Sequence, residues 1–87
     1  MFCLKIHRCN TLASMSEQEY INIVCTNIKE QRIKRGYTQF EFASLLNVDD
    51  SSIRRIEAGR TSPTLKTLYR LAKALDMNLV DLLPPTI

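Results

Sequence analysis

The chain has 87 residues and a mass of 10.0 kDa, which suffices for one small domain. Hydrophobic residues make up 45% and charged residues 24%, a balance that excludes a wholly disordered chain, and no apolar run approaches the ~18 residues of a membrane-spanning helix. Twelve Lys and Arg against nine Asp and Glu give a net charge of +3. This mild excess permits an anionic partner, and the positions of the charges must decide whether one is expected.

The first sixteen residues differ from the rest of the chain. They contain no acidic residue, show no helical periodicity, and carry Lys5, His7 and Arg8 where a secretory signal would have its apolar core. We expect residues 1–16 to form a poorly ordered extension and residues 17–87 to form the folded domain. A translation start at Met15 is an alternative explanation of the extension.

The three cysteines cannot form a complete set of disulfides, which favours a reducing cytoplasm. Cys3, His7 and Cys9 are spaced too closely for an ordinary zinc site, and a fourth ligand would have to come from Cys25 or an acid. We therefore expect no metal and no cofactor, and place Cys25 in the core or at a subunit contact. With a single histidine and no nucleophile paired with a base, the chain is not expected to be an enzyme.

The first predicted helix runs from about residue 17 to residue 35. Ser16 and Glu19 have the spacing of a capping box at its start, and Gly36 follows as a stop signal. Its apolar positions are Tyr20, Ile21, Val24, Ile28 and, less regularly, Ile33.

Two short helices are predicted next, over residues 39–46 and 50–58. Thr38 and Glu41 form a second capping pattern, Asp49 is placed to cap the later helix, and Gly59 ends it. The residues between the two helices are too few for anything but a tight turn, in which Asn47 tolerates a left-handed backbone.

This helix, turn and helix have the lengths of a helix-turn-helix. Ala43 is small enough for the helices to cross closely, and Val48 and Ile53 are expected to fill the inner angle between them. Ile53 and Ile56 then point inward, which leaves a polar outer face with two arginines. Arginine can donate to both O6 and N7 of guanine, so this face suits a major groove. It is formed by Ser51, Arg55 and Ala58, flanked by Ser52 and Arg54.

Two further helices complete the prediction. Thr64 or Ser62 would cap a fourth helix whose apolar stripe is Leu65, Leu68, Leu71, Ala72 and Leu75. A short fifth helix would begin at Asn78 and end at the Pro84-Pro85 pair. No segment alternates with a period of two, so the expected fold class is all-α with five helices.

The order and spacing of these segments resemble the DNA-binding domain of the lambda-repressor-like, Cro/XRE family of bacterial and phage transcriptional regulators. The resemblance covers residues 28–83 and is carried by IKEQR (28–32), GYTQFEFA (36–43), IRRIEAGR (53–60), PTLKTL (63–68), LAKAL (71–75) and DLL (81–83). It implies five helices, of which the third is the recognition helix, and double-stranded DNA as the partner.

The resemblance also assigns roles to individual residues. Base-reading positions fall on Asp50, Ser51 and Arg55, with Arg54 adjacent; phosphate-binding positions fall on Gln39, Arg60, Thr61 and Ser62; Arg32 and Glu57 match a structural salt bridge. Three residues depart from the family pattern, which puts the sequence preference in question but not the fold: the acidic Asp50, the bulky Phe40, and Asn47 in place of a glycine.

The apolar C-terminal residues exceed what a short terminal helix can bury alone, so part of this segment is expected to contact a second subunit. The candidates are Leu79, Val80, Leu82, Leu83 and Ile87. The leading hypothesis is a sequence-specific transcriptional regulator that binds a two-fold operator as a homodimer. The alternative is a protein-interaction module of the same fold, such as an antitoxin or a partner of another regulator.

Overall fold

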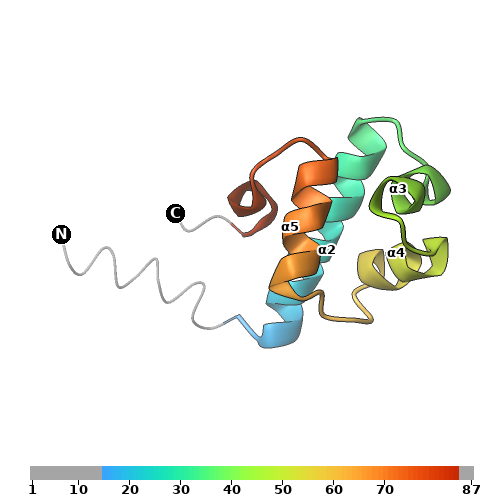
Figure 1. The fold of residues 1–87 in the computed structure, drawn as a ribbon. Helices are drawn as coiled ribbons and strands as arrows, with labels where there is room; N and C mark the ends of the chain where they lie inside the picture. Colours follow the sequence, from blue (N-terminus) through green and yellow to red (C-terminus); the bar gives the residue numbers. More distant parts are fainter. Residues whose placement is uncertain (1–14, 85–87) are drawn as a thin grey trace.

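The computed structural model describes residues 15–84, which form four α-helices and one 3-10 helix (Figure 1). The elements in order are α2 (Glu17–Lys34), α3 (Gln39–Leu46), α4 (Asp50–Glu57), α5 (Leu65–Ala74) and the 3-10 helix η1 (Leu79–Leu82). No strand occurs within this range, which confirms the all-α prediction. Residues 1–14 of the expected extension (residues 1–16), including the Cys3, His7 and Cys9 cluster, lie outside the described residues, as does Ile87. Ser16, the last residue of that range, is the N-cap of α2.

The predicted count of five helices is not confirmed, because residues 15–84 form four α-helices and one 3-10 helix. The fifth element is η1, a single 3-10 turn of four residues. Leu83 follows η1 with an extended backbone (φ −85°, ψ 157°), because the residue before a proline is disfavoured in helical conformation and Pro84 comes next.

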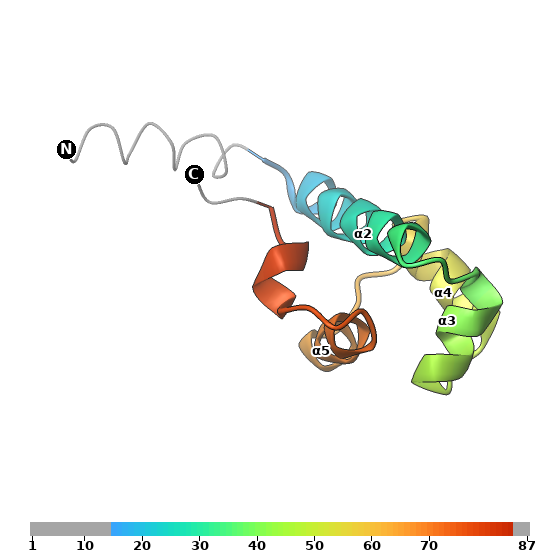
Figure 2. The same ribbon diagram turned by 90° about the horizontal axis from the view of Figure 1, so that it is seen from above.

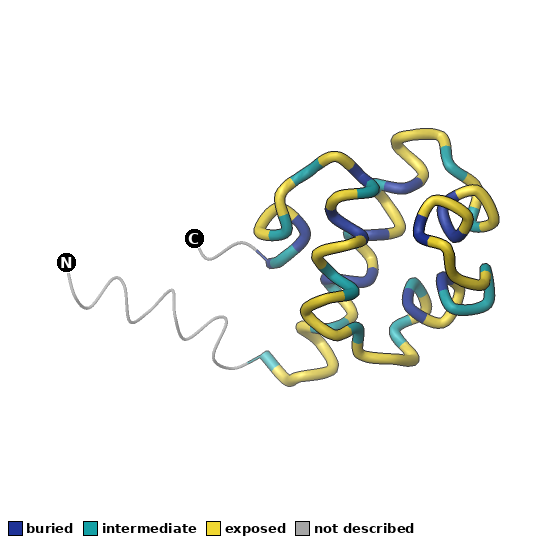
Figure 3. Tube along the Cα trace, viewed as in Figure 1, coloured by how far each residue is buried: buried dark blue, intermediate teal, exposed yellow. Residues whose placement is uncertain are grey.

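The helices surround one core from different sides. Seen from above, α2 and α5 lie on opposite sides, α3 and α4 close one end, and η1 closes the other (Figure 2). Every element contributes buried residues (Figure 3). The largest fully buried side chains include Phe42, Ile53 and Leu71. Cys25 belongs to this core, and burial together with the nearby charge of Glu57 raises the pKa of its thiol.

Two residues expected in the core are exposed instead. Leu65 keeps 72% of its surface because it is the first residue of α5 and lies before the part of the helix that reaches the core. Val48 is also exposed, because the turn that begins at Asn47 holds its backbone, with the Val48 N–H bonded to the Ala43 carbonyl at 3.0 Å. Ile53 alone of the predicted pair fills the angle between α3 and α4.

The predicted helix ends are largely confirmed. Ser16 with Glu19, and Thr38 with Glu41, form complete capping boxes, and the Thr64 side chain accepts from the Thr67 N–H at 3.1 Å. The left-handed turn at Asn47 is present, with φ at 57°. Asp49 occupies the N-cap of α4, but its side chain makes no capping hydrogen bond.

Gly36 follows α2 and Gly59 follows α4, and the two differ in how closely other residues surround them. Both have positive φ, but a Cβ on Gly36 would meet nothing within 4 Å, whereas one on Gly59 would lie 2.6 Å from Asn22 Oδ1. The side chain of Asn22 accepts from Gln18 Nε2, which also donates to the Gly59 carbonyl. Gln18 and Asn22, near the start of α2, therefore pack closely against Gly59 at the end of α4.

We expect Gly36→Ala to lower the free energy of unfolding by about 1 kcal/mol, the cost of a left-handed backbone for alanine. Gly59→Ala should lower it by about 2 kcal/mol, because the new methyl group also displaces Asn22. Urea unfolding of the two variants measures the difference. Equal losses would show that Gln18 and Asn22 do not hold the end of α4.

Candidate nucleic-acid interface

The outer face of α4 is polar and open to solvent. Ile53 and Ile56 anchor the helix in the core, while Arg54 and Arg55 on the opposite side are exposed. This is the orientation that the sequence predicted for the recognition helix. The arginines are accordingly available to a partner.

Cationic side chains gather around this face. A shallow hollow beside α4 is lined by Ser51, Arg54 and Arg55, by Gln39 at the start of α3, and by Arg60 beyond the end of α4. Lys29 of α2 lines it too. Lys29 was not predicted as a site residue, because its position beside α4 depends on how α2 packs against that helix.

Glu57 also lines the hollow, but its charge is already matched. Arg32 Nε donates to Glu57 Oε2 at 2.6 Å and Arg32 Nη2 donates to Oε1 at 3.1 Å, and the two side chains keep only 8% and 3% of their surface. Arg32 Nη1 also donates to the carbonyl of Tyr37 at 2.6 Å. This expected ion pair ties α2 to α4 and leaves the positive charge of the hollow largely uncompensated.

Gln39 joins the same network, since its Nε2 donates to Glu57 Oε1 at 3.1 Å. The side chain that the sequence assigned to a phosphate is therefore held by Glu57. What Gln39 offers an anion is the backbone N–H at the first position of α3, where a helix leaves its N–H groups without a partner in the helix.

The loop after α4 contains the other predicted phosphate-binding residues. Arg60, Thr61 and Ser62 are all exposed, and the Arg60 N–H donates to the Arg55 carbonyl at 3.1 Å. This bond holds the start of the loop against the last turn of α4.

Asp50 is paired rather than free. Its Oδ2 accepts from Arg54 Nη1 at 2.8 Å, one helical turn away, and both side chains remain substantially exposed. This pair was not among those expected from the sequence, although acids and bases four residues apart in a helix commonly form one.

The residues predicted to contact a second subunit separate into two groups. Leu82 is fully buried in the core and its carbonyl accepts from Asn27 Nδ2 at 2.9 Å, so its assignment to a subunit contact is wrong. Val80 is exposed, while Leu79 and Leu83 are partly buried against the core. Leu82 therefore anchors η1 in the bundle, Leu79 and Leu83 pack partly against the core, and Val80 is the residue of this set that is exposed.

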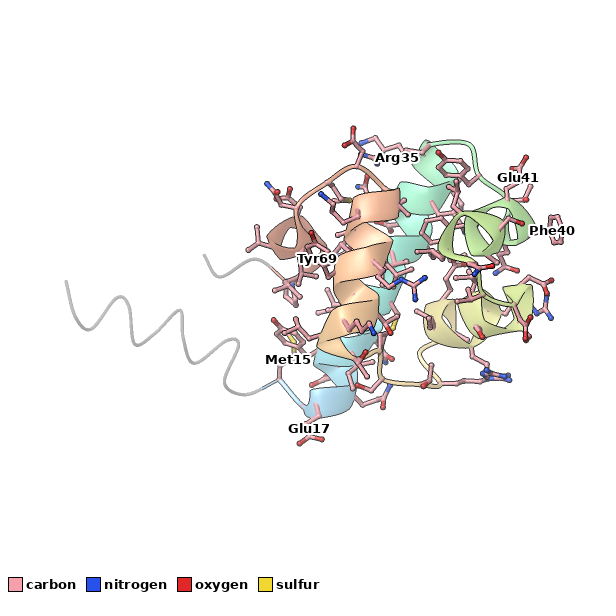
Figure 4. All side chains as sticks on the ribbon, viewed as in Figure 1. Met15, Glu17, Arg35, Phe40, Glu41 and Tyr69 are labelled. Carbon is pink, nitrogen blue, oxygen red and sulfur yellow. The ribbon has the colours of Figure 1, made fainter. Side chains whose placement is uncertain are left out.

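Phe40 is a large apolar side chain that lies on the surface. It keeps 69% of its surface and points from α3 away from the bundle (Figure 4).

Within residues 15–84, no group of three or more His, Cys, Asp or Glu could hold a metal ion. No helix in that range is long and apolar enough to cross a membrane.

Two short helices joined by a tight turn, with the second exposing its cations, define a helix-turn-helix protein. The family model HTH_3, described as Helix-turn-helix, matches residues 28–82, well over half of the chain. The chain belongs to the HTH_3 helix-turn-helix family, which confirms the resemblance seen in the sequence.

Relatives and solved structures agree with this assignment. An uncharacterized HTH-type transcriptional regulator of Sinorhizobium fredii, y4dJ, is 36% identical over 64 residues, which are 74% of this chain and 83% of the relative. The crystal structure of the hypothetical transcription factor NHTF from Neisseria has a TM-score of 0.73 at 26% identity over 80% of each chain. The restriction-modification controller protein C.AhdI from Aeromonas hydrophila has a TM-score of 0.68 at 27% identity, over 71% of this chain and 94% of that chain. The family match and these named relatives thus indicate a transcription regulator.

Proposed function

We propose that this chain is a sequence-specific DNA-binding transcriptional regulator that acts in the cytoplasm as a homodimer on a two-fold operator. The exposed, cationic outer face of α4 carries the proposal. Duplex DNA is the partner that fits it, because phosphates attract the positive hollow and guanine edges accept from arginine.

In the proposed complex α4 enters the major groove. Ser51, Arg54 and Arg55 lie on the face that would meet base edges, and Asp50 lies at the end of the helix that enters first. The free N–H of Gln39 and the exposed Arg60, Thr61 and Ser62 flank this face, where the phosphates of the groove walls would pass. Base contacts would determine which DNA sequence is bound, and phosphate contacts would fix the position of the protein on the duplex.

A homodimer would place two α4 helices in successive major grooves about 34 Å apart. The exposed Val80, with Leu79 and Leu83 beside it, supplies an apolar edge for the subunit contact. Ile87 remains part of the proposal and lies outside the described residues.

Selection of bound sites from random duplex DNA at two salt concentrations tests the proposal. We expect a consensus with two-fold symmetry, bound much more weakly at the higher salt because each neutralised phosphate releases counterions. A pool that shows no enrichment, or binding that is insensitive to salt, would contradict the proposal.

The protein-interaction module is the second candidate, and the exposed Phe40 and Leu45 on α3 favour it. Both are apolar, and neither lines the cationic hollow. Phe40→Ser separates the two functions. If this variant binds the selected duplex normally but fails to regulate in the cell, a protein partner on α3 is required; if it regulates normally, the second candidate is contradicted.

A further inference from the structure

An exposed ion pair lies where α4 would first meet the DNA. Asp50 is the first residue of α4, and its Oδ2 accepts from Arg54 Nη1 at 2.8 Å. The side chains of Arg54 and Asp50 keep 55% and 42% of their surface. Exposed pairs of this kind add little to folding stability, so the pair calls for another explanation.

We propose that Asp50 is a specificity-determining residue that holds Arg54 in the orientation that reads a guanine. The inference rests on the proposed DNA-binding function and goes beyond it, because it assigns the acidic residue a role through Arg54 and not through a base of its own.

The geometry of the guanidinium supports this role. Asp50 occupies Nη1, and within residues 15–84 neither Nε nor Nη2 of Arg54 has a hydrogen-bond partner. The edge of a guanidinium formed by Nε and Nη2 can donate to two acceptors at once, as Arg32 shows: its Nε and Nη2 donate side by side to the two carboxylate oxygens of Glu57. Guanine presents O6 and N7 as a similar pair of acceptors, so Arg54 can bind guanine while Asp50 keeps Nη1.

The negative charge of Asp50 also supports the proposed role of this residue. An unpaired arginine binds any phosphate it reaches, whereas the carboxylate of Asp50 offsets the charge of Arg54 and repels the DNA backbone. Asp50 therefore lowers the affinity of Arg54 for phosphate and favours its contact with a base. Arg55 has no ion-pair partner in the part of the chain that the structure describes, so this restraint applies to Arg54 and not to its neighbour.

Two neighbouring acids provide a matched test. Asp50→Ser removes the acceptor that Arg54 uses, since a serine is too short to reach it. Asp49→Ser removes the same charge one residue earlier, at an N-cap position that serine suits and where Asp49 makes no side-chain hydrogen bond. Each variant is measured by fluorescence anisotropy on the selected duplex and on duplexes with every base pair changed in turn.

We expect Asp50→Ser to lose about ten-fold in discrimination at one G·C pair while it binds unrelated duplexes more tightly. Asp49→Ser should gain general affinity too, but keep the full discrimination. Arg54→Lys should lose discrimination at the same base pair, because lysine lacks the two-pronged edge, and Asp50→Ser should then have no further effect on it.

Identical discrimination in Asp50→Ser and Asp49→Ser would overturn the inference and leave the proposed function standing. A loss of discrimination by Asp50→Ser that persists in the Arg54→Lys background would overturn it too, because Asp50 would then act without Arg54. If the wild-type chain selects no sequence at all, the proposed function fails, and this inference fails with it.

Discussion

Replacing Glu57 by alanine should lower the free energy of unfolding by about 3–5 kcal/mol, the largest stability effect that we expect from a single change in the charged residues. The substitution leaves the buried guanidinium of Arg32 without its counterion and removes the acceptor of Gln39. Three elements would lose their common anchor at once, since Arg32 lies in α2, Gln39 begins α3 and Glu57 ends α4. Chemical denaturation monitored by circular dichroism measures the loss.

Asp50→Ala is the matched control for this prediction. It breaks the other ion pair of α4, which is exposed, so the loss should be only about 0.5 kcal/mol. The double variant Arg32→Met with Glu57→Leu should recover much of the stability, because no charge is then left buried without a partner. Equal losses in Glu57→Ala and Asp50→Ala would contradict the structural role of the buried pair.

Replacing Arg55 by alanine should weaken binding to the selected duplex by about ten-fold to a hundred-fold, the range expected when an arginine loses its contact to a base. Stability should change little, because Arg55 is exposed and its side chain makes no hydrogen bond within residues 15–84. Titration of a labelled duplex, with thermal unfolding of the same sample, measures both quantities.

Arg35→Ala supplies the comparison. It removes the same charge at the C-terminal end of α2, away from the cationic hollow, where Arg35 Nη1 donates to Gln31 Oε1. We expect a small, salt-dependent loss that is the same on every duplex. If Arg35→Ala and Arg55→Ala weaken binding equally, the outer face of α4 does not read the sequence.

Local signals in the sequence were sufficient for most of the fold. The capping boxes at Ser16 and Thr38 and the stop at Gly36 are short-range interactions, so their residue types alone predict where helices begin and end. The inward placement of Ile53 and Ile56 followed from helical periodicity, and it correctly left Arg54 and Arg55 outside.

The predictions that the structure overturned concern burial that depends on how the helices pack against one another. Periodicity assigns Leu65 to the apolar side of α5 but does not say that its end of the helix extends past the core. The apolar composition of residues 79–83 does not reveal that Leu82 is needed inside the bundle. The contribution of Lys29 to the hollow depends on the packing of α2 against α4, which no local pattern encodes.

In the proposed complex the outer face of α4 is the surface that contacts duplex DNA. Amide chemical-shift mapping of the ¹⁵N-labelled chain, titrated with the selected duplex, tests it most directly. The largest shifts should fall on residues 50–57 of α4, on Gln39 and on residues 60–62, while the exposed side of α5 around Tyr69 should change little. Shifts concentrated on α5 and η1, with no shifts on α4, would show that α4 is not the surface that binds DNA.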